Sequence, residues 1–128
     1  MSKIRGKVLL VDDDPEDLQY YELILSACGY EVLPCGSYEK SLPLLAEEPL
    51  DCVVVSQGSP AFEGRIVLEH VIGGDRGLPV LVLARCLHMK SYLDAMQLGA
   101  VDYLEKPVSP ERIEWVLRTH VRHRSVAA

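Results

Sequence analysis

The sequence has no long hydrophobic run and no segment of biased composition. Its first apolar run, Val8–Val11, is far shorter than the ~20 residues that cross a membrane as a helix, and the polar, basic stretch 1–7 before it does not resemble a signal peptide. We therefore expect a cytoplasmic protein. Because repeats and low-complexity stretches are also absent, the 128 residues are expected to form one domain, 1–128.

Positive charge and paired cysteine motifs are also scarce. The formal net charge of -6 gives the surface no electrostatic reason to bind nucleic acid or an anionic membrane. None of the four cysteines forms a CxxC motif, and disulfides are rare in a cytosolic setting. We expect four free thiols, with Cys86 as the exposed one.

Short apolar runs rich in valine and leucine recur along the chain. The strongest are Val8–Val11, Cys52–Val55 and Val80–Ala84, and weaker ones occur at Tyr30–Leu33 and Val101–Leu104. Continuous apolar strands are typical of a parallel sheet that helices cover on both faces.

Helix-length amphipathic segments separate these runs. The first begins with Asp14 as N-cap and Pro15 at the first helical position, has acidic residues in its first turn, and ends near Gly29. In the second helix, Pro43 either kinks the helix or moves its start later. The later helices are expected over Tyr38–Glu48, Arg65–Ile72, Lys90–Leu98 and from Ser109-Pro110 to about Arg124. Five strands alternating with five helices predict a doubly wound α/β fold.

Chemically informative residues lie at or just past the expected strand ends. They are Asp12 and Asp13 after the first strand, Ser56 and Ala84 at the ends of the third and fourth, and Lys106 after the fifth. Ligands of such sheets bind at the carboxyl ends of the strands. The sequence therefore predicts that these residues meet in one pocket.

Together these motifs resemble the receiver domain of bacterial two-component response regulators, over about residues 7–124. The matching segments are Val11-Asp12-Asp13-Asp14-Pro15, Pro60-Ala61-Phe62-Glu63-Gly64, Leu98-Gly99-Ala100-Val101-Asp102-Tyr103 and Lys106-Pro107-Val108-Ser109-Pro110. The resemblance implies a flavodoxin-like (βα)5 fold with strand order 2-1-3-4-5. It also implies an acidic pair that holds Mg²⁺, an aspartate that accepts a phosphoryl group, and a hydroxyl and a lysine that bind the phosphoryl oxygens.

Two positions depart from that pattern. Asp12 and Asp13 match the acidic pair, Lys106 the lysine and Tyr103 the switch aromatic residue. However, Ser56 replaces the phosphoacceptor aspartate and Ala84 replaces the phosphoryl-binding hydroxyl. A carboxylate attacks as it stands, whereas a serine hydroxyl needs a general base. We therefore predict a degenerate receiver, or pseudo-receiver, that is not an enzyme and has no catalytic residue.

The metal site implied by the resemblance is weakened as well. Without a carboxylate at Ser56, Mg²⁺ would keep only Asp13, a water-mediated Asp12 and the Gly58 carbonyl as ligands. We expect no required cofactor and weak Mg²⁺ binding at most. Lys106 is then expected to pair with Asp12 and Asp13 and leave a self-neutralised pocket.

The last helix carries an outward-facing stripe. Helical phase turns Trp115, Arg118 and Arg122 away from the core. The inward side is expected to hold Ile113, Val116, Leu117, His120 and Val121. Tryptophan and arginine are enriched at binding hot spots, and receivers commonly bind partners through the fourth helix, fifth strand and fifth helix. We predict a protein partner or self-association there, and no binding of nucleic acid or membrane.

Two other functions stay open. One is a phosphoacceptor receiver that uses Asp13 or Ser56 with a histidine kinase or a small phosphodonor. The other is a small-ligand binder, which is less favoured because no Gly-rich loop follows the first strand and Asp12-Asp13-Asp14 would repel phosphate. No DNA-binding segment follows the last helix, so the chain is expected to be either a stand-alone regulator or one domain of a longer protein.

Overall fold

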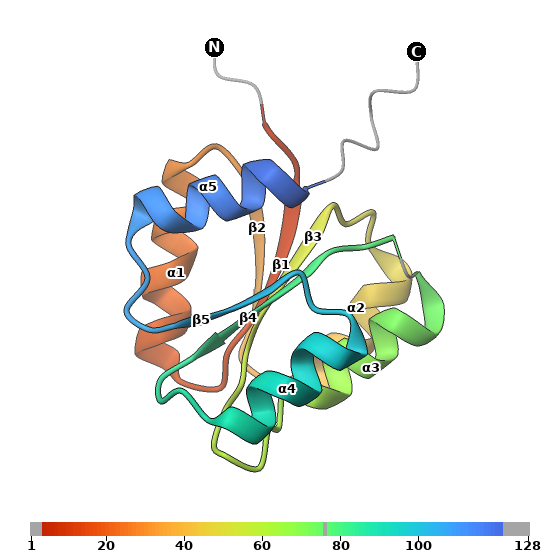
Figure 1. Cartoon of the computed structure of the whole chain (residues 1–128). Coiled ribbons are helices and arrows are strands. Elements are labelled where there is room, and N and C mark those ends of the chain that lie inside the picture. The colour runs from red at the N-terminus through yellow and green to blue at the C-terminus, as the bar shows by residue number, and fades with distance from the viewer. Residues whose placement is uncertain (1–3, 76, 122–128) are drawn as a thin grey trace.

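A computed structural model describes residues 4–75 and 77–121 of the chain, and over these ranges five strands alternate with five helices (Figure 1). The strands are β1 (Lys7–Val11), β2 (Glu31–Cys35), β3 (Cys52–Ser56), β4 (Val80–Ala84) and β5 (Asp102–Glu105). The helices are α1 (Pro15–Ala27), α2 (Tyr38–Glu47), α3 (Arg65–Gly74), α4 (Met89–Leu98) and α5 (Pro110–His120). None of these described helices has the length and apolar content that spanning a bilayer requires.

All neighbouring strands are parallel, and their order is β2-β1-β3-β4-β5, as predicted. The chain passes from β1 to β2 on one side and then returns to place β3 on the other side of β1. This arrangement makes β1 and β3 the switch point of the sheet, where such folds bind ligands. The register pairs Val11 with Val55, so the residues that follow them, Asp12 and Ser56, lie at the same level.

Helices cover both faces of the sheet (Figure 1). On one face, α1 and α5 pack against a core that includes Leu10, Val54 and Leu83. On the other face, α2, α3 and α4 enclose a second core that includes Val53 and Val82. Every residue of β3 and β4 is buried, which explains why these strands are continuous apolar runs in the sequence.

Local signals set most helix ends. The Asp14 side chain accepts hydrogen bonds from the backbone N–H groups of Glu16 and Asp17, so the predicted N-cap of α1 is confirmed. Helix α2 begins at Tyr38 and contains Pro43, so the proline does not move its start. At the end of α4, Gly99 adopts φ 109°, a left-handed conformation that glycine takes without strain.

Three details of the predicted helices were wrong. Helix α3 continues through Gly73 and Gly74 instead of ending before them. Helix α5 ends at His120 rather than near Arg124, because Val121 has extended backbone angles. The His120 side chain is exposed and does not face the core, since a polar imidazole at the last helical residue gains more from water than from apolar packing.

Strand β2 forms one edge of the sheet. The Glu31 N–H donates to the Gly6 carbonyl, and the Cys35 carbonyl accepts from the Asp12 N–H, so alternate residues of β2 point their backbone groups at β1. Pro34 belongs to the other alternating set of residues, so its backbone nitrogen points away from β1, toward the outer edge of the sheet. A proline at this position removes no bond from the ladder.

Candidate functional site

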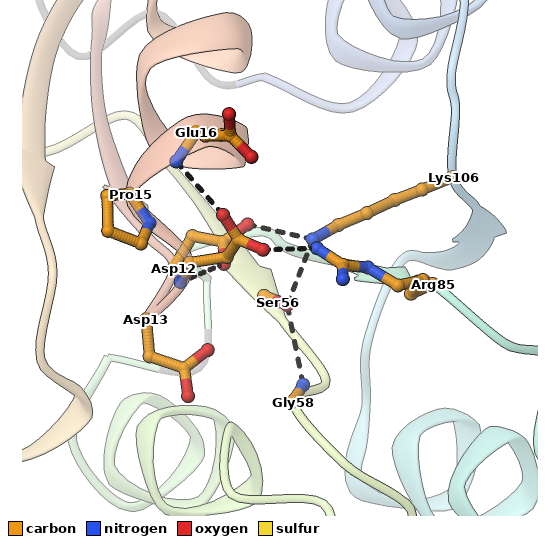
Figure 2. A pocket seen from close by; sticks show the side chains of 9 residues that line it. Asp12, Asp13, Pro15, Glu16, Ser56, Gly58, Arg85 and Lys106 are labelled. Carbon is orange, nitrogen blue, oxygen red and sulfur yellow. Dashed lines mark hydrogen bonds and ion pairs between the residues drawn. The ribbon is translucent and has the colours of Figure 1, made fainter.

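An open cavity of about 440 Å³ lies at the carboxyl edge of the sheet (Figure 2). The predicted residues Asp12, Asp13, Ser56, Gly58 and Lys106 all line it, so the structure brings them together as expected. Ala84 was predicted in the same pocket but does not line the cavity, because it is fully buried at the end of β4 and its methyl group belongs to the core.

Lys106 contacts three other side chains at the pocket. Its ammonium nitrogen lies 2.8 Å from Asp12 Oδ2, 2.8 Å from Asp17 Oδ2 and 3.2 Å from Ser56 Oγ, and its side chain is 7% exposed. The predicted pairing with Asp12 is confirmed. The predicted pairing with Asp13 was wrong, because Asp17 in the first turn of α1 takes that place. Figure 2 shows the Asp13 carboxylate turned away from Lys106.

The charge of Asp12 depends on Lys106. Asp12 is 2% exposed, and this burial raises the pKa of its carboxyl above the ordinary value, against the lowering effect of the Lys106 hydrogen bond. Burial alone would lower the pKa of Lys106, but its hydrogen bonds to Asp12 and Asp17 raise it. The ammonium therefore stays charged and compensates the buried carboxylate.

A second cation, Arg85, closes the outer side of the pocket. Its guanidinium donates to a carboxylate oxygen of Asp14 and, at 2.8 Å, to Asp17 Oδ2, so Lys106 and Arg85 share one oxygen of Asp17. Burial would raise the pKa of Asp17, but the hydrogen bonds from Lys106 and Arg85 outweigh it and lower the pKa. These ion pairs join α1 to the ends of β4 and β5.

Neither Arg85, which lines the cavity, nor Asp17, which pairs with Lys106 beside it, was predicted as a site residue. In the sequence, Asp17 looks like an ordinary acidic residue in the first turn of a helix, and Arg85 looks like an exposed basic residue in a loop. Their charges and their places just past β1 and β4 were the only available hints.

Asp13 has a different partner. It is exposed, and the Tyr38 hydroxyl at the start of α2 donates to Asp13 Oδ1 at 3.2 Å. Burial, together with the nearby Asp13 charge, raises the pKa of Tyr38 far above its ordinary value. The phenol therefore keeps its proton and remains a hydrogen-bond donor to this carboxylate.

Ser56 ends β3 as a buried, neutral group. Its Oγ accepts from Lys106 and, at 3.4 Å, from the Gly58 N–H. Gly58 has φ 84°, and a side chain on Gly64 would collide with the Ser56 carbonyl. Both glycines let the loop after β3 fold tightly around the serine.

This donor set fits Mg²⁺ poorly. Mg²⁺ takes six oxygens in near-octahedral geometry, usually with one or two carboxylates. Of the three aspartates that line the cavity, only Asp13 has no ion pair with Lys106 or Arg85, and the Tyr38 hydroxyl donates a hydrogen bond to it. Within residues 4–75 and 77–121, no three His, Cys, Asp or Glu side chains cluster in a way that could hold a metal.

Tyr103 lies in the core beside the pocket. It is 5% exposed, its hydroxyl donates to the Gln57 side chain and accepts from the His88 N–H at 3.3 Å, and its ring meets the Tyr92 ring edge-on at 5.5 Å. Gln57, which is 1% exposed, was missed by the sequence analysis. Its only signal in the sequence was its position as a polar residue directly after β3.

The predicted surface residues lie as expected where the structure describes them. Trp115 is 54% exposed and Arg118 is also exposed, whereas Arg122 lies outside the described residues. Five further large apolar side chains are exposed on α4 and the loop before it: Leu87, Met89, Tyr92, Leu93 and Met96. The four cysteines are free thiols, with Cys86 exposed, as predicted.

The fold and the pocket define a receiver-type signalling domain. A family model described as the response regulator receiver domain matches residues 8–118, and this chain belongs to that family. Among solved structures, a response regulator receiver domain protein from Clostridium thermocellum is 26% identical, with a TM-score of 0.82 over 90% of this chain and 93% of that one.

Full-length relatives are longer than this chain. "Two-component response regulator ARR11" of Arabidopsis thaliana is 34% identical over 127 residues, which are 98% of this chain and 24% of that protein. "Transcriptional regulatory protein KdpE" of Mycobacterium tuberculosis is 34% identical over 124 residues, or 94% of this chain and 53% of that protein. The chain thus spans a quarter to a half of these relatives. Since they include a plant protein, they support a two-component receiver without assigning a bacterial origin.

Proposed function

We propose that this domain acts in a two-component pathway as a protein-interaction module that works without phosphorylation. It is then a degenerate receiver and not an enzyme. The observation that carries the proposal is Ser56 at the end of β3, where its hydroxyl accepts a hydrogen bond from Lys106 in a pocket of otherwise receiver-like arrangement.

The surroundings of Ser56 do not activate it. A serine hydroxyl becomes a nucleophile when a neighbouring base removes its proton. Lys106 is protonated and points a donor at Ser56 Oγ, and Asp12 is engaged by the same ammonium. No histidine lines the described cavity. The hydroxyl is therefore expected to stay protonated and unreactive.

Stabilisation of a bound phosphoryl group is also reduced. Ala84 offers no hydroxyl at the end of β4, and the next residue, Arg85, is paired with Asp14 and Asp17. Because the three aspartates that line the cavity are bound by Lys106, Arg85 and Tyr38 of the chain itself, we propose that no cofactor is required and that Mg²⁺ binds weakly at most.

The interaction surface that we propose is formed by α4, β5 and α5. It presents Trp115 and Arg118 from α5 and an apolar stripe from α4 that includes Met89, Leu93 and Met96. Positions i, i+4 and i+7 lie on one side of a helix, so this stripe is continuous. Contiguous exposed apolar side chains commonly mark binding sites for protein partners or for a second copy. We propose such a protein contact here, in the cytoplasm.

Mass spectrometry of the intact protein after incubation with acetyl phosphate and Mg²⁺ tests the proposal. We expect no mass increase under conditions that phosphorylate an ordinary receiver in the same tube. A stoichiometric gain of one phosphoryl group would overturn it and favour a phosphoacceptor receiver instead. Because Asp13 is exposed at the pocket, the variants Asp13→Asn and Ser56→Ala would then show which side chain accepts the group.

A further inference from the structure

We infer that the side-chain amide of Gln57 holds Tyr103 in its inward position and so fixes the loop between β4 and α4 without a phosphoryl group. This inference rests on the proposed function, because it says how the α4 surface is set when no phosphoryl group arrives. We call the Gln57–Tyr103–His88 hydrogen-bond chain the amide latch.

Gln57 is placed firmly enough to act as an anchor. Its backbone N–H donates to the Leu83 carbonyl at 2.7 Å, and its carbonyl accepts from the Gly64 N–H at 3.1 Å. Its side chain accepts from the Tyr103 hydroxyl and donates to the Ser59 carbonyl at 3.3 Å. A buried amide without such partners is destabilised by the loss of its hydrogen bonds to water, so the observed orientation of the Gln57 side chain is the favoured one.

Tyr103 connects this anchor to the β4–α4 loop. Its hydroxyl donates to Gln57 and accepts from the backbone N–H of His88, so one phenol oxygen joins the loop after β3 to the loop after β4. The edge-on contact with Tyr92 ties the same ring to α4. Ala84, the last residue of β4, has no polar side-chain atom that could make this connection.

The bond to His88 reaches the start of α4. His88 is the N-cap of this helix, and its Nδ1 accepts from the Ser91 N–H at 3.3 Å. At the other end of the loop, Arg85 is held by Asp14 and Asp17. Hydrogen bonds therefore hold the loop 85–88 at both ends, at Arg85 and at His88. The exposed apolar stripe of α4 begins at Met89, the residue directly after His88.

Hydrogen–deuterium exchange measured by mass spectrometry tests the amide latch. Tyr103→Phe removes only the hydroxyl, and Gln57→Leu removes the amide while keeping a side chain of similar size. Loss of a hydrogen bond of ordinary strength should speed exchange over residues 85–93 about tenfold in either variant.

The matched control is Tyr21→Phe, which also removes a buried hydroxyl. Tyr21 accepts from the Val108 N–H at 3.1 Å on the α1 and α5 side of the sheet. This variant should leave exchange over residues 85–93 unchanged and speed it near Val108 instead. Equal acceleration over 85–93 in all three variants would show a general loss of stability and overturn the amide latch.

A double variant separates a connected chain from two independent contacts. Gln57→Leu with Tyr103→Phe should speed exchange no more than the larger single effect, since both changes break the same bond. Multiplicative effects, or unchanged exchange in Tyr103→Phe, would overturn the inference. These measurements need no phosphodonor and no partner. Failure of the latch therefore leaves the proposed function standing, and phosphorylation in the mass experiment would overturn the function without altering the exchange result.

Discussion

The hydroxyl of Tyr38 donates to Asp13 Oδ1 across 3.2 Å, from the first residue of α2 to the residue just before the N-cap of α1. This contact completes a pattern in which every aspartate around the cavity is engaged by a group of the chain itself. Lys106 engages Asp12, and Arg85 engages Asp14. Metal binding must therefore compete with internal partners.

The first prediction concerns Mg²⁺. By calorimetry, the protein should show a dissociation constant in the millimolar range or weaker, and Ser56→Asp should tighten binding by adding a carboxylate. Adding Tyr38→Phe to Ser56→Asp should tighten it about another tenfold, because the competing hydrogen bond to Asp13 is gone.

The control for this series is Asp94→Asn, which removes a carboxylate on α4 that pairs with Arg65 and Lys90 and does not line the cavity. It should leave Mg²⁺ binding unchanged. Micromolar affinity in the unmodified protein would contradict the prediction and the assignment of internal partners on which it depends.

The second prediction concerns the buried pair of Asp12 and Lys106. Lys106→Met should reduce the free energy of unfolding by about 3 kcal/mol at neutral pH, since it leaves the buried Asp12 carboxylate without a cation. Adding Asp12→Asn should restore most of the loss, because no uncompensated charge remains. Urea denaturation of the two variants measures both effects. Equal losses in both would show that Lys106 stabilises the fold by packing alone.

The third prediction concerns pH. The pKa of Asp17 is lowered in the folded protein, so its ion pairs contribute stability above its unfolded pKa of about 4, and this contribution is lost as pH falls through the folded value. Asp17→Asn should cost about 1 kcal/mol at pH 7 and flatten the decline in stability between about pH 5 and pH 2.

Asp94→Asn is again the matched control, because Asp94, like Asp17, pairs with one lysine and one arginine. The partners of Asp94 are solvent-exposed, so this variant should change stability by less than ~0.5 kcal/mol. Similar effects of the two substitutions would mean that the position of Asp17 between Lys106 and Arg85 adds nothing to the free energy of unfolding.

The fourth prediction concerns the α5 surface. Trp115→Ala should weaken self-association or partner capture while changing the free energy of unfolding by less than ~0.5 kcal/mol, because the ring is more than half exposed. Sedimentation at several concentrations and urea denaturation measure the two quantities. Leu23→Ala on α1, which removes an apolar side chain that is even more exposed, should leave association unchanged. Unfolding of the Trp115 variant would instead assign the ring to the core.

The fold was predictable because its central strands, β1, β3 and β4, are buried on both faces. Burial forces β3 and β4 to be continuous apolar runs, and capping residues such as Asp14 mark where the next helix begins. Because the strands are parallel, residues that directly follow them, as Asp12 and Lys106 do, lie at one edge of the sheet. The pocket could be predicted for this reason alone.

The partners inside the pocket could not be predicted in the same way. Whether Lys106 turns to Asp13 or to Asp17 depends on side-chain rotamers and on where α1 lies over the sheet, and the sequence pattern carries neither. Ser56 is the last residue of β3 and Gln57 is the next residue. The Gln57 amide nevertheless points to Tyr103 rather than into the cavity. Such choices are fixed by packing between segments that are distant in the chain.

The edge of the sheet at β2 has a consequence for how the protein behaves in concentrated solution. Pro34 presents a ring nitrogen without hydrogen along the outer side of this strand, so an approaching strand from another molecule meets a gap in the row of donors. Prolines and short edge strands are means by which natural sheets resist open-ended strand addition. Replacing Pro34 would therefore make β2 a better template for aggregation without altering the pocket at all.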